Sequence, residues 1–334
     1  MVAGPAVAPV PHVPLAHLPT PLEPLDRLSK WLGGPRIWVK RDDATGLALG
    51  GNKVRKLEYL LADALEQGAD VVVTTGATQS NHCRQTAAAA ARLGLRCELL
   101  LEHRFPDWPE TYNGGGNVQL DRLFSATILD HEQGTDMVDA LATRIRQLLA
   151  DGQSPYAIPL GGSSIVGAFG YRTAAVELLR QADEHGFVPR EIVHATSSGG
   201  TQAGLIAGLA IRRSGVPVLG ISAGGSAEYL GAIVRELAEG VIARLGVDRT
   251  FGPDAVVVDD TQVGEAYGVP TDAMWEAVSM CAEREGLLLD PVYSGKAMAG
   301  LFAHIRQGRY DRRDDVVFVH TGGTPALFAY AKSE

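Results

Sequence analysis

Short apolar runs alternate with longer amphipathic segments from Arg36 towards the end of the chain. The runs are rich in Val, Ile and Leu and predict strands at 70–76, 96–102, 126–131, 156–162, 191–198, 217–222, 255–260 and 315–323. Such β-branched runs are typical of strands that are buried on both faces, as in parallel sheets.

Between these runs, apolar residues recur at the spacing of one helical face. The predicted helices are 53–67, 81–94, 137–150, 165–185, 201–214, 226–244, 272–285 and 294–307. Strands that alternate with helices predict an α/β fold, with parallel twisted sheets flanked by helices. A chain of 334 residues is long enough for two such domains.

Most glycine clusters stand where a predicted strand ends and a predicted helix begins. They lie at 50–52, 74–81, 161–167, 197–204, 222–228 and 320–325. Ligands of open parallel sheets bind at the carboxyl ends of the strands. We therefore expect several of these junctions to face one cleft.

Composition and charge argue against several classes of function. The net charge is −9 and the chain has no basic cluster, so we expect no nucleic acid partner. No apolar run reaches the roughly 18 residues of a membrane span, and the first residues lack the pattern of a signal peptide. The three cysteines are scattered without metal-ligand spacing, which favours a cytoplasmic protein that binds no metal.

The segment "HATSSGGTQAGL" (194–205) places small residues between a strand and a helix. Backbone N–H groups there can approach an anion closely, and the helix dipole favours negative charge. The hydroxyls of Ser198 and Thr201 add donors. The segment predicts a phosphate cradle, and the alternative is a glycine-rich turn in which a threonine caps the helix.

A second junction, "GATQSNHCRQTAAAAARLG" (76–94), places Ser80, Asn81 and His82 at the entrance of a helix. The N–H groups of residues 79–82 can bind a carboxylate. The alternative is an ordinary N-cap formed by the serine or the asparagine. His82 stays open as a cap, a surface residue or a site residue.

Lys53 opens a helix directly behind Gly50 and Gly51, where the helix dipole disfavours a cation. We interpret this conflict with local preference as a sign of function. The dipole and the neighbouring cations Arg55 and Lys56 are expected to lower the pKa of Lys53. An amine with a low pKa is a good nucleophile towards an aldehyde. The alternative is a solvated lysine in the first turn.

Seven segments together resemble the fold-type II pyridoxal 5'-phosphate (PLP) enzymes. They are "KRDD", "GGNKVRKLEYL", "GATQSNHCRQTAAAAA", "SSGGTQAGL", "YGVP", "LDPVYSGKAMAGL" and "HTGGTPALFAY". More narrowly, they resemble the 1-aminocyclopropane-1-carboxylate (ACC) deaminase/D-cysteine desulfhydrase family, in that family's order and from about residue 17 to 330. The resemblance implies the two-domain fold of the tryptophan synthase β-subunit. The large PLP-binding domain would comprise 1–56 and 166–334, the small domain 57–165, and the assembly would be a homodimer.

The resemblance also implies which residues bind the cofactor. Lys53 matches the lysine that bonds covalently to PLP, and Asn81 the asparagine that binds its 3′-oxygen. The phosphate would be held by Ser198, Gly199, Gly200 and Thr201, with Lys56 also within reach.

By the same resemblance, further residues would face an amino-acid substrate. Ser80 matches a serine near the substrate that relays a proton, and Tyr267 and Tyr293 match tyrosines that lie against cofactor and substrate. The expected substrate-binding set is Ser80, Asn81, His82, Tyr267 and Tyr293. The base that removes the α-proton stays open among Lys53, a tyrosine and Ser80.

Two positions beside the cofactor ring, Ser294 and Thr321, depart from the cyclopropane deaminases, which carry glutamate and leucine there. A carboxylate keeps the ring nitrogen protonated and makes the cofactor a strong electron sink. A hydroxyl pair is a weaker partner, which is sufficient when a good leaving group departs from Cβ. The alternative is that Ser294 only caps the helix 294–307.

These observations favour α,β-elimination on a cysteine-like amino acid, as in a D-cysteine desulfhydrase that forms pyruvate, ammonia and sulfide. The first alternative is an L-cysteate sulfo-lyase that releases sulfite, although the sequence places no cation for the sulfonate. ACC deamination is the next. A protein of another class, either a non-catalytic binder of phosphate ligands or a kinase-like enzyme, would leave Lys53 unexplained.

Overall fold

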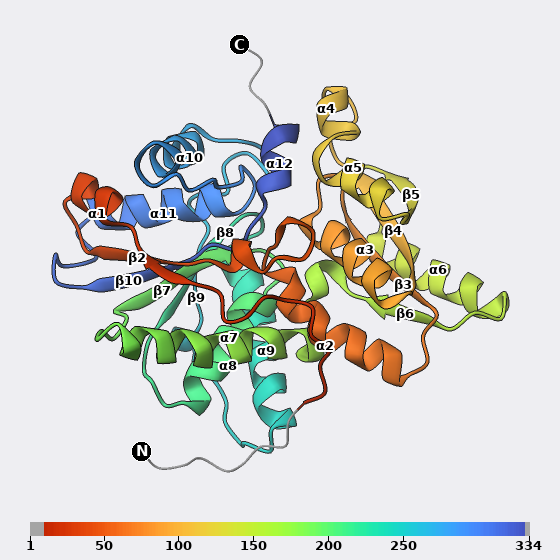
Figure 1. Ribbon diagram of the computed structural model, residues 1–334, viewed down its shortest axis with the longest axis horizontal. Helices are drawn as coiled ribbons and strands as arrows, with labels where there is room; N and C mark the ends of the chain where they lie inside the picture. The colour runs from red at the N-terminus through yellow and green to blue at the C-terminus, as the bar shows by residue number, and fades with distance from the viewer. Residues whose placement is uncertain (1–9, 331–334) are drawn as a thin grey trace.

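The computed structural model describes residues 10–330, which form two sheets that lie side by side (Figure 1). The larger sheet has the strand order β1-β2-β10-β7-β8-β9 and the smaller one β5-β4-β3-β6. All neighbours are parallel except β1 and β2. The strands are β1 (Leu22–Pro24), β2 (Arg36–Lys40), β3 (Val71–Ala77), β4 (Arg96–His103), β5 (Thr127–Glu132), β6 (Pro155–Ile158), β7 (Glu191–Thr196), β8 (Val218–Ser222), β9 (Val257–Asp259) and β10 (Asp315–Val319). The predicted α/β fold with parallel sheets is confirmed.

Twelve α-helices of the described chain flank these sheets. They are α1 (Asp26–Leu32), α2 (Lys53–Glu66), α3 (Asn81–Leu93), α4 (Glu110–Asn113), α5 (Gly116–Leu123), α6 (Met137–Ala150), α7 (Ile165–Glu184), α8 (Gly200–Ile211), α9 (Ala227–Arg244), α10 (Asp272–Glu285), α11 (Ser294–Arg306) and α12 (Thr324–Ala329). Each of the predicted helices forms, with its ends within three residues of the expected ones.

The prediction of elements differs from the structure in two ways. It lacks β1, β2, α1, α4, α5 and α12, which are short and give little periodic signal. It also extends two strands too far, since β6 ends at Ile158 and β10 at Val319. The chain beyond each of these ends contains glycines at positive φ, which leave the extended conformation.

The larger sheet is buried between two layers of helices. Side chains alternate along β10, so that Val317 and Val319 pack with α7, α8 and α9, whereas Val316 and Phe318 pack with α1, α10 and α11. Both sets are fully or almost fully buried. This two-sided burial explains the uninterrupted apolar run of the strand.

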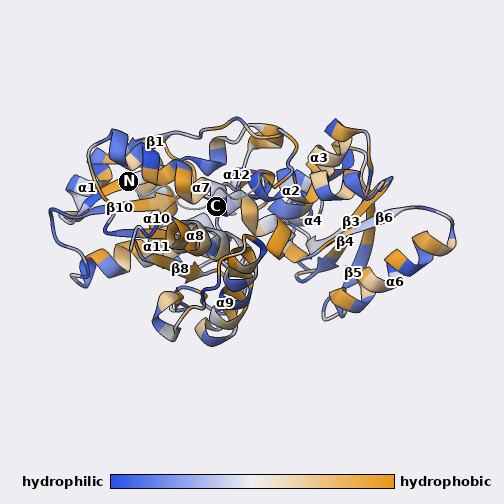
Figure 2. Ribbon diagram, turned by 90° about the horizontal axis from the view of Figure 1, so that it is seen from below, coloured by the Kyte–Doolittle hydropathy of each residue, from blue (hydrophilic) through white to orange (hydrophobic). Residues whose placement is uncertain are grey.

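The smaller sheet packs against α2, α3 and α5 on one face and against α6 on the other. Ala87, Ala89 and Ala90 of α3 are completely buried, because the small side chains let the helix approach the sheet closely. Hydrophobic and hydrophilic residues alternate around α6, which lies at the outer end of the molecule (Figure 2).

The chain enters the smaller sheet through α2 and leaves it through α7, and these two helices pack on each other. A Cβ atom on Gly170 of α7 would lie 2.2 Å from the Arg55 carbonyl oxygen of α2, so only glycine fits there. The division into domains 1–56 with 166–334 and 57–165 stays a prediction, of which 1–9 and 331–334 lie outside the described residues.

No helix between residues 10 and 330 is both long and apolar enough to cross a membrane. Within the same part of the chain, no cluster of three or more His, Cys, Asp or Glu side chains is arranged to hold a metal ion.

Candidate active site

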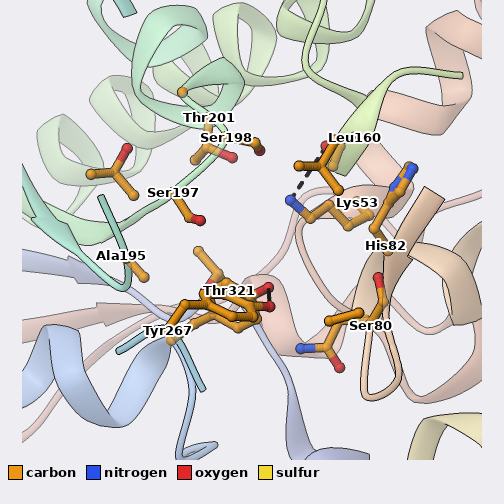
Figure 3. Close-up of a pocket in the computed structure, with 18 of the residues that line it drawn as sticks. Lys53, Ser80, His82, Leu160, Ala195, Ser197, Ser198, Thr201, Tyr267 and Thr321 are labelled. Atoms are coloured by element: carbon orange, nitrogen blue, oxygen red, sulfur yellow. Dashed lines mark hydrogen bonds between the residues drawn. The ribbon is translucent and has the colours of Figure 1, made fainter. Parts of the chain in front are cut away.

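A cavity of about 320 Å³ lies where the two sheets meet (Figure 3). The segments that follow β3, β7, β8 and β10 all contribute to its wall, so the expected convergence of strand ends on one cleft is found. Ten of the candidate site residues line it: Lys53, Ser80, Asn81, His82, Ser198, Gly199, Thr201, Tyr267, Tyr293 and Thr321.

Three candidates lie behind the wall of the cavity. Lys56 Nζ donates hydrogen bonds to Gly161 O and Ser163 Oγ, both at 3.1 Å. The N–H group of Gly200 donates to Ser163 Oγ at 3.2 Å and to Ser198 O at 3.1 Å. Ser294 is 1% exposed and does not line the cavity.

Lys53 is the first residue of α2, and its Nζ donates a 3.3 Å hydrogen bond to Gly161 O (dashed in Figure 3). Desolvation lowers the pKa of Lys53 to about 8, although a hydrogen bond with Lys56 opposes the shift. The expected direction is correct, but the expected cause was wrong. Arg55 turns away from the cavity and pairs with Asp42 at 2.9 Å, so burial rather than neighbouring positive charge lowers the pKa.

Ser80 is the N-cap of α3, and its Oγ accepts a 3.1 Å hydrogen bond from Cys83 N. Ser80 therefore caps the helix and also lines the cavity, so the two interpretations of this serine are compatible. Asn81 Oδ1 accepts hydrogen bonds from Arg84 Nη1 and Asn117 Nδ2, both at 3.1 Å. Because the oxygen is engaged on the protein side, the Asn81 amide nitrogen remains as a donor towards a ligand oxygen.

His82 connects α3 to the smaller sheet. Its Nε2 lies 2.8 Å from Thr74 Oγ1, and Thr74 in turn donates to Ile158 O at 2.8 Å. The threonine hydroxyl has one hydrogen, so the proton of the first bond must reside on His82 Nε2. Burial, together with Lys53 and Lys56, holds the pKa of His82 well below its usual range, so the ring is neutral. Its role in substrate binding stays a prediction.

The anion cradle is built around the start of α8. Gly199 adopts a φ of +81° and is the N-cap, so the alternative in which Thr201 caps the helix is wrong. Thr201 Oγ1 instead accepts a 3.1 Å hydrogen bond from Asn52 Nδ2. Ser163 Oγ donates to Ser198 Oγ at 2.7 Å.

This cradle has the properties that a bound phosphate requires. The first N–H groups of a helix have no intrahelical acceptor and attract anions. Hydroxyl groups surround them, and Lys56 Nζ lies 3.0 Å from where a Cβ atom of Gly200 would be. A side chain at Gly161 would come within 2.4 Å of Ser198 Oγ, so glycine keeps this space open.

Tyr267 and Tyr293 form the opposite wall, and their hydroxyl groups are hydrogen-bonded to each other (Figure 3). Burial raises the pKa of both phenols. The Arg104 guanidinium lies 4.9 Å from the centre of the Tyr267 ring and also lines the cavity. Because burial raises their pKa values, both phenols are protonated at neutral pH.

A buried carboxylate lies directly behind Ser294. Ser294 Oγ donates to Asp290 Oδ1 at 2.6 Å and accepts a hydrogen bond from Asp290 N at 2.8 Å. Tyr293, not Ser294, is the N-cap of α11, so the alternative that Ser294 caps this helix is wrong. The electrostatic difference between a serine and a glutamate at position 294 is therefore smaller than the sequence suggests, because the Asp290 carboxylate lies one hydrogen bond from Ser294.

Sequence reasoning missed five residues that shape the site: Asn52, Arg84, Arg104, Asn117 and Asp290. Arg104 had a usable signal, because it stands two residues beyond the predicted strand 96–102, at the end where ligands bind. Asp290 stands inside the quoted segment "LDPVYSGKAMAGL". Nothing in the local sequence indicates that Arg84 and Asn117 meet Asn81.

A lysine of low pKa beside an anion cradle, in a cleft between two α/β units, defines a class of enzyme. Its cofactor carries an aldehyde that reacts with the amine and a phosphate that binds in the cradle, and PLP has both groups. The residues present therefore fit this cofactor.

Comparison with known proteins agrees with this class. The model of the family described as pyridoxal-phosphate dependent enzyme matches residues 13–322. The chain is 46% identical over 320 residues to a D-cysteine desulfhydrase of Salmonella typhi, covering 96% of each chain. It superimposes on the crystal structure of an ACC deaminase homologue with a TM-score of 0.87 and 37% identity, covering 97% of this chain and 95% of the other.

A processed threonine deaminase isoform from Solanum lycopersicum shares the fold at a TM-score of 0.63 and 16% identity, over 91% of this chain and 79% of the other. The chain belongs to the fold-type II PLP-dependent enzymes and, within them, to the ACC deaminase/D-cysteine desulfhydrase family. Its cofactor is PLP.

Proposed function

We propose that the protein is a PLP-dependent carbon–sulfur lyase that converts D-cysteine to pyruvate, ammonia and sulfide by α,β-elimination. The observation that carries this proposal is the charge of the cavity wall. Lys53 faces the cavity, and no Asp or Glu is among the described residues that line it. A site without a carboxylate in direct contact suits reactions with a good leaving group on Cβ.

When bound, PLP withdraws electrons from Cα of the amino acid. The chain supplies the other functions. The first N–H groups of α3 and the Ser80 hydroxyl bind the α-carboxylate, and the amide nitrogen of Asn81 donates to the 3′-oxygen of the cofactor. The α8 cradle, assisted by Lys56 through Ser163, holds the phosphate.

Among the three candidate bases, Lys53 is the most suitable. Its pKa of about 8 leaves a useful fraction of neutral amine at neutral pH. The phenols of Tyr267 and Tyr293 have raised pKa values because they are buried, and they stay protonated. In this proposal Lys53 Nζ takes the α-proton, and the tyrosine pair encloses the substrate and excludes water from it.

The relative from Salmonella typhi, which is 46% identical to this chain, supports D-cysteine as the substrate, since that protein is named a D-cysteine desulfhydrase. Incubation of the holoenzyme with D-cysteine, L-cysteine, L-cysteate and ACC, with assays for sulfide, sulfite, pyruvate and 2-oxobutyrate, tests the proposal. We expect sulfide and pyruvate in equal amounts from D-cysteine and no 2-oxobutyrate from ACC. Release of 2-oxobutyrate as the main activity would contradict it.

The sulfo-lyase alternative gains one observation from the structure, because Arg104 supplies in the cavity wall the cation that the sequence did not place. Membership in a family of PLP-dependent enzymes argues against the kinase-like and the non-catalytic alternatives. The homodimer and the cytoplasmic location remain part of the proposal. Light scattering on the purified holoenzyme tests the dimer, and cell fractionation tests the location.

A further inference from the structure

The segment between β9 and α10, residues 260–271, carries Tyr267 and forms neither a helix nor a strand. Residues 264–266, directly before the tyrosine, are exposed. The backbone hydrogen bonds within the segment are local ones, such as the bond from Val269 N to Ala266 O at 3.2 Å. A segment with so little internal structure needs contacts from outside to keep a side chain in one place.

A buried lysine of α11 supplies such contacts. Lys296 Nζ donates hydrogen bonds to the carbonyl oxygens of Val263 at 2.6 Å and of Ala266 at 3.2 Å. The side chain is completely buried. Burial lowers the pKa of Lys296 to about 8 and Asp290 opposes the shift, so the amine is mainly protonated at neutral pH. A buried charge is costly unless it is hydrogen-bonded, and the segment provides the two acceptors.

The same helix carries the second tyrosine of the cavity wall. Tyr293 is the N-cap of α11, and Lys296 follows three residues later. On the other side of the contact, Ala266 directly precedes Tyr267. The hydroxyl groups of the two tyrosines are hydrogen-bonded, and their ring centres lie 5.8 Å apart. The tyrosines are therefore joined twice, at their hydroxyl groups and through the lysine.

We propose that Lys296 is a positioning residue that holds Tyr267 against Tyr293 and so keeps the cavity closed around the substrate. This inference rests on the proposed function, in which the tyrosine pair encloses the substrate. Lys296 does not line the cavity, so it acts through Tyr267 and not by contact with substrate or cofactor. When the lysine is removed, we expect the Tyr267 ring to leave the wall and water to enter.

The test is a double-mutant cycle on the holoenzyme with D-cysteine. Lys296→Met keeps a side chain of similar length and removes its donors, Tyr267→Ala removes the ring, and a third variant carries both changes. If Lys296 acts through Tyr267, its substitution has no further effect once the ring is gone. His304→Gln is the matched control, because His304 belongs to the same helix and pairs at 2.8 Å with Asp259, directly before the segment.

We expect Lys296→Met to lower kcat/KM for D-cysteine by about 10- to 100-fold, mainly through KM, as for the loss of hydrogen bonds from a charged donor. In the Tyr267→Ala background the same change should lower kcat/KM by less than about twofold. His304→Gln should leave it unchanged. The proposal would be overturned if Lys296→Met had the same effect in both backgrounds, had no effect in the wild type, or were matched by His304→Gln.

A second measurement needs neither activity nor cofactor. In the cofactor-free protein, backbone amides of residues 260–271 should exchange with deuterium about tenfold faster in Lys296→Met than in the wild type. Amides of β10 should keep their rates. Equal rates for the segment in both proteins would contradict the proposal. Lys296→Gln, which keeps a shorter donor, should shift the rates less in the same direction, and it takes the place of Lys296→Met if that variant does not fold.

The exchange rates also separate this inference from the proposed function. If the wild-type holoenzyme eliminates sulfur from no cysteine-like substrate, the proposed function is wrong, and the exchange rates still decide whether Lys296 holds the segment. If the wild-type enzyme is active and the cycle shows independent effects, only the role of Lys296 is wrong.

Discussion

The guanidinium of Arg84 fixes the orientation of the Asn81 side chain. Arg84 Nη1 donates to Asn81 Oδ1 at 3.1 Å, and Arg84 Nη2 donates to Gly50 O at 2.6 Å. One completely buried cation thus connects the asparagine at the start of α3 to the loop that precedes Lys53. The two residues that would contact the ring of the cofactor are therefore positioned by a third that does not line the cavity.

This relationship predicts that Arg84→Met weakens cofactor binding without removing a group that contacts the cofactor. The variant removes the Arg84 donor from the Gly50 carbonyl and from Asn117 Oδ1 and leaves Asn81 Oδ1 with Asn117 Nδ2 alone. Each buried unsatisfied group costs about 1–3 kcal/mol. We expect the dissociation constant for PLP to rise at least tenfold. Fluorescence titration of the cofactor-free protein measures it.

The matched control for this experiment is Arg92→Gln, which changes an exposed arginine in the last turn of the same helix. Its affinity for PLP should equal that of the wild type. If Arg84→Met bound PLP as tightly as Arg92→Gln, the positioning role would have to be given up.

The pKa of Lys53 predicts how fast the cofactor-free protein takes up PLP at different pH values. Only the neutral amine attacks an aldehyde, and desolvation lowers the pKa to about 8. The rate constant should therefore rise about tenfold per pH unit below 8 and level off above it. Stopped-flow absorbance from pH 6 to 10, with Lys53→Ala as the inactive control, measures the profile. A rate that still rises steeply at pH 9.5 would show an ordinary lysine.

Asp290 predicts a combined effect on stability and on the cofactor. Its two carboxylate oxygens accept four hydrogen bonds, from the N–H groups of Val292, Tyr293 and Ser294 and from the Ser294 hydroxyl. Asp290→Asn replaces one acceptor by a donor that faces N–H groups. We expect a loss of about 1–3 kcal/mol in the free energy of unfolding, measured by urea denaturation.

Ser294→Ala distinguishes the two roles of this pair. It removes the hydrogen bond from the Ser294 hydroxyl to the Asp290 carboxylate but keeps the backbone hydrogen bonds to Asp290. We expect it to be more stable than Asp290→Asn and yet to change the pH dependence of the PLP absorbance in the same direction. A normal spectrum in both variants would mean that the charge of Asp290 does not reach the cofactor.

Asp121 predicts a dependence of stability on pH that is separate from catalysis. It is fully buried, and neither carboxylate oxygen has a hydrogen-bond partner among the described residues. Burial raises the pKa of Asp121 to about 8, with Arg84 and Arg122 opposing the shift. A carboxyl whose pKa is raised on folding stabilises the fold while it is protonated, and this stabilisation is lost as the pH rises from about 4 to 8.

The variant Asp121→Asn should therefore melt at a higher temperature than the wild type at pH 8, and the difference should shrink at pH 5. Thermal unfolding followed by circular dichroism at the two pH values checks this. A difference in melting temperature that is the same at both pH values would show that Asp121 does not titrate in this range.

The sequence by itself determined the α/β class, the extents of the main helices and the identity of the candidate lysine. Local pattern carries these features, because β-branched runs, helical periodicity and glycine at strand ends reflect interactions within a few residues. The prediction that PLP is the cofactor came from the family resemblance, which rests on seven separate segments.

Only the tertiary structure decided how the candidate residues are held and charged. Burial in the cleft, not a neighbouring cation, lowers the pKa of Lys53, and burial depends on elements far away in the chain. The contact of Arg84 with Asn117 and the approach of Arg104 to Tyr267 likewise join segments separated by 33 residues and by more than 160. A sequence pattern records what each residue is, whereas the electrostatics of a site depend on what folding brings next to it and how much water it removes.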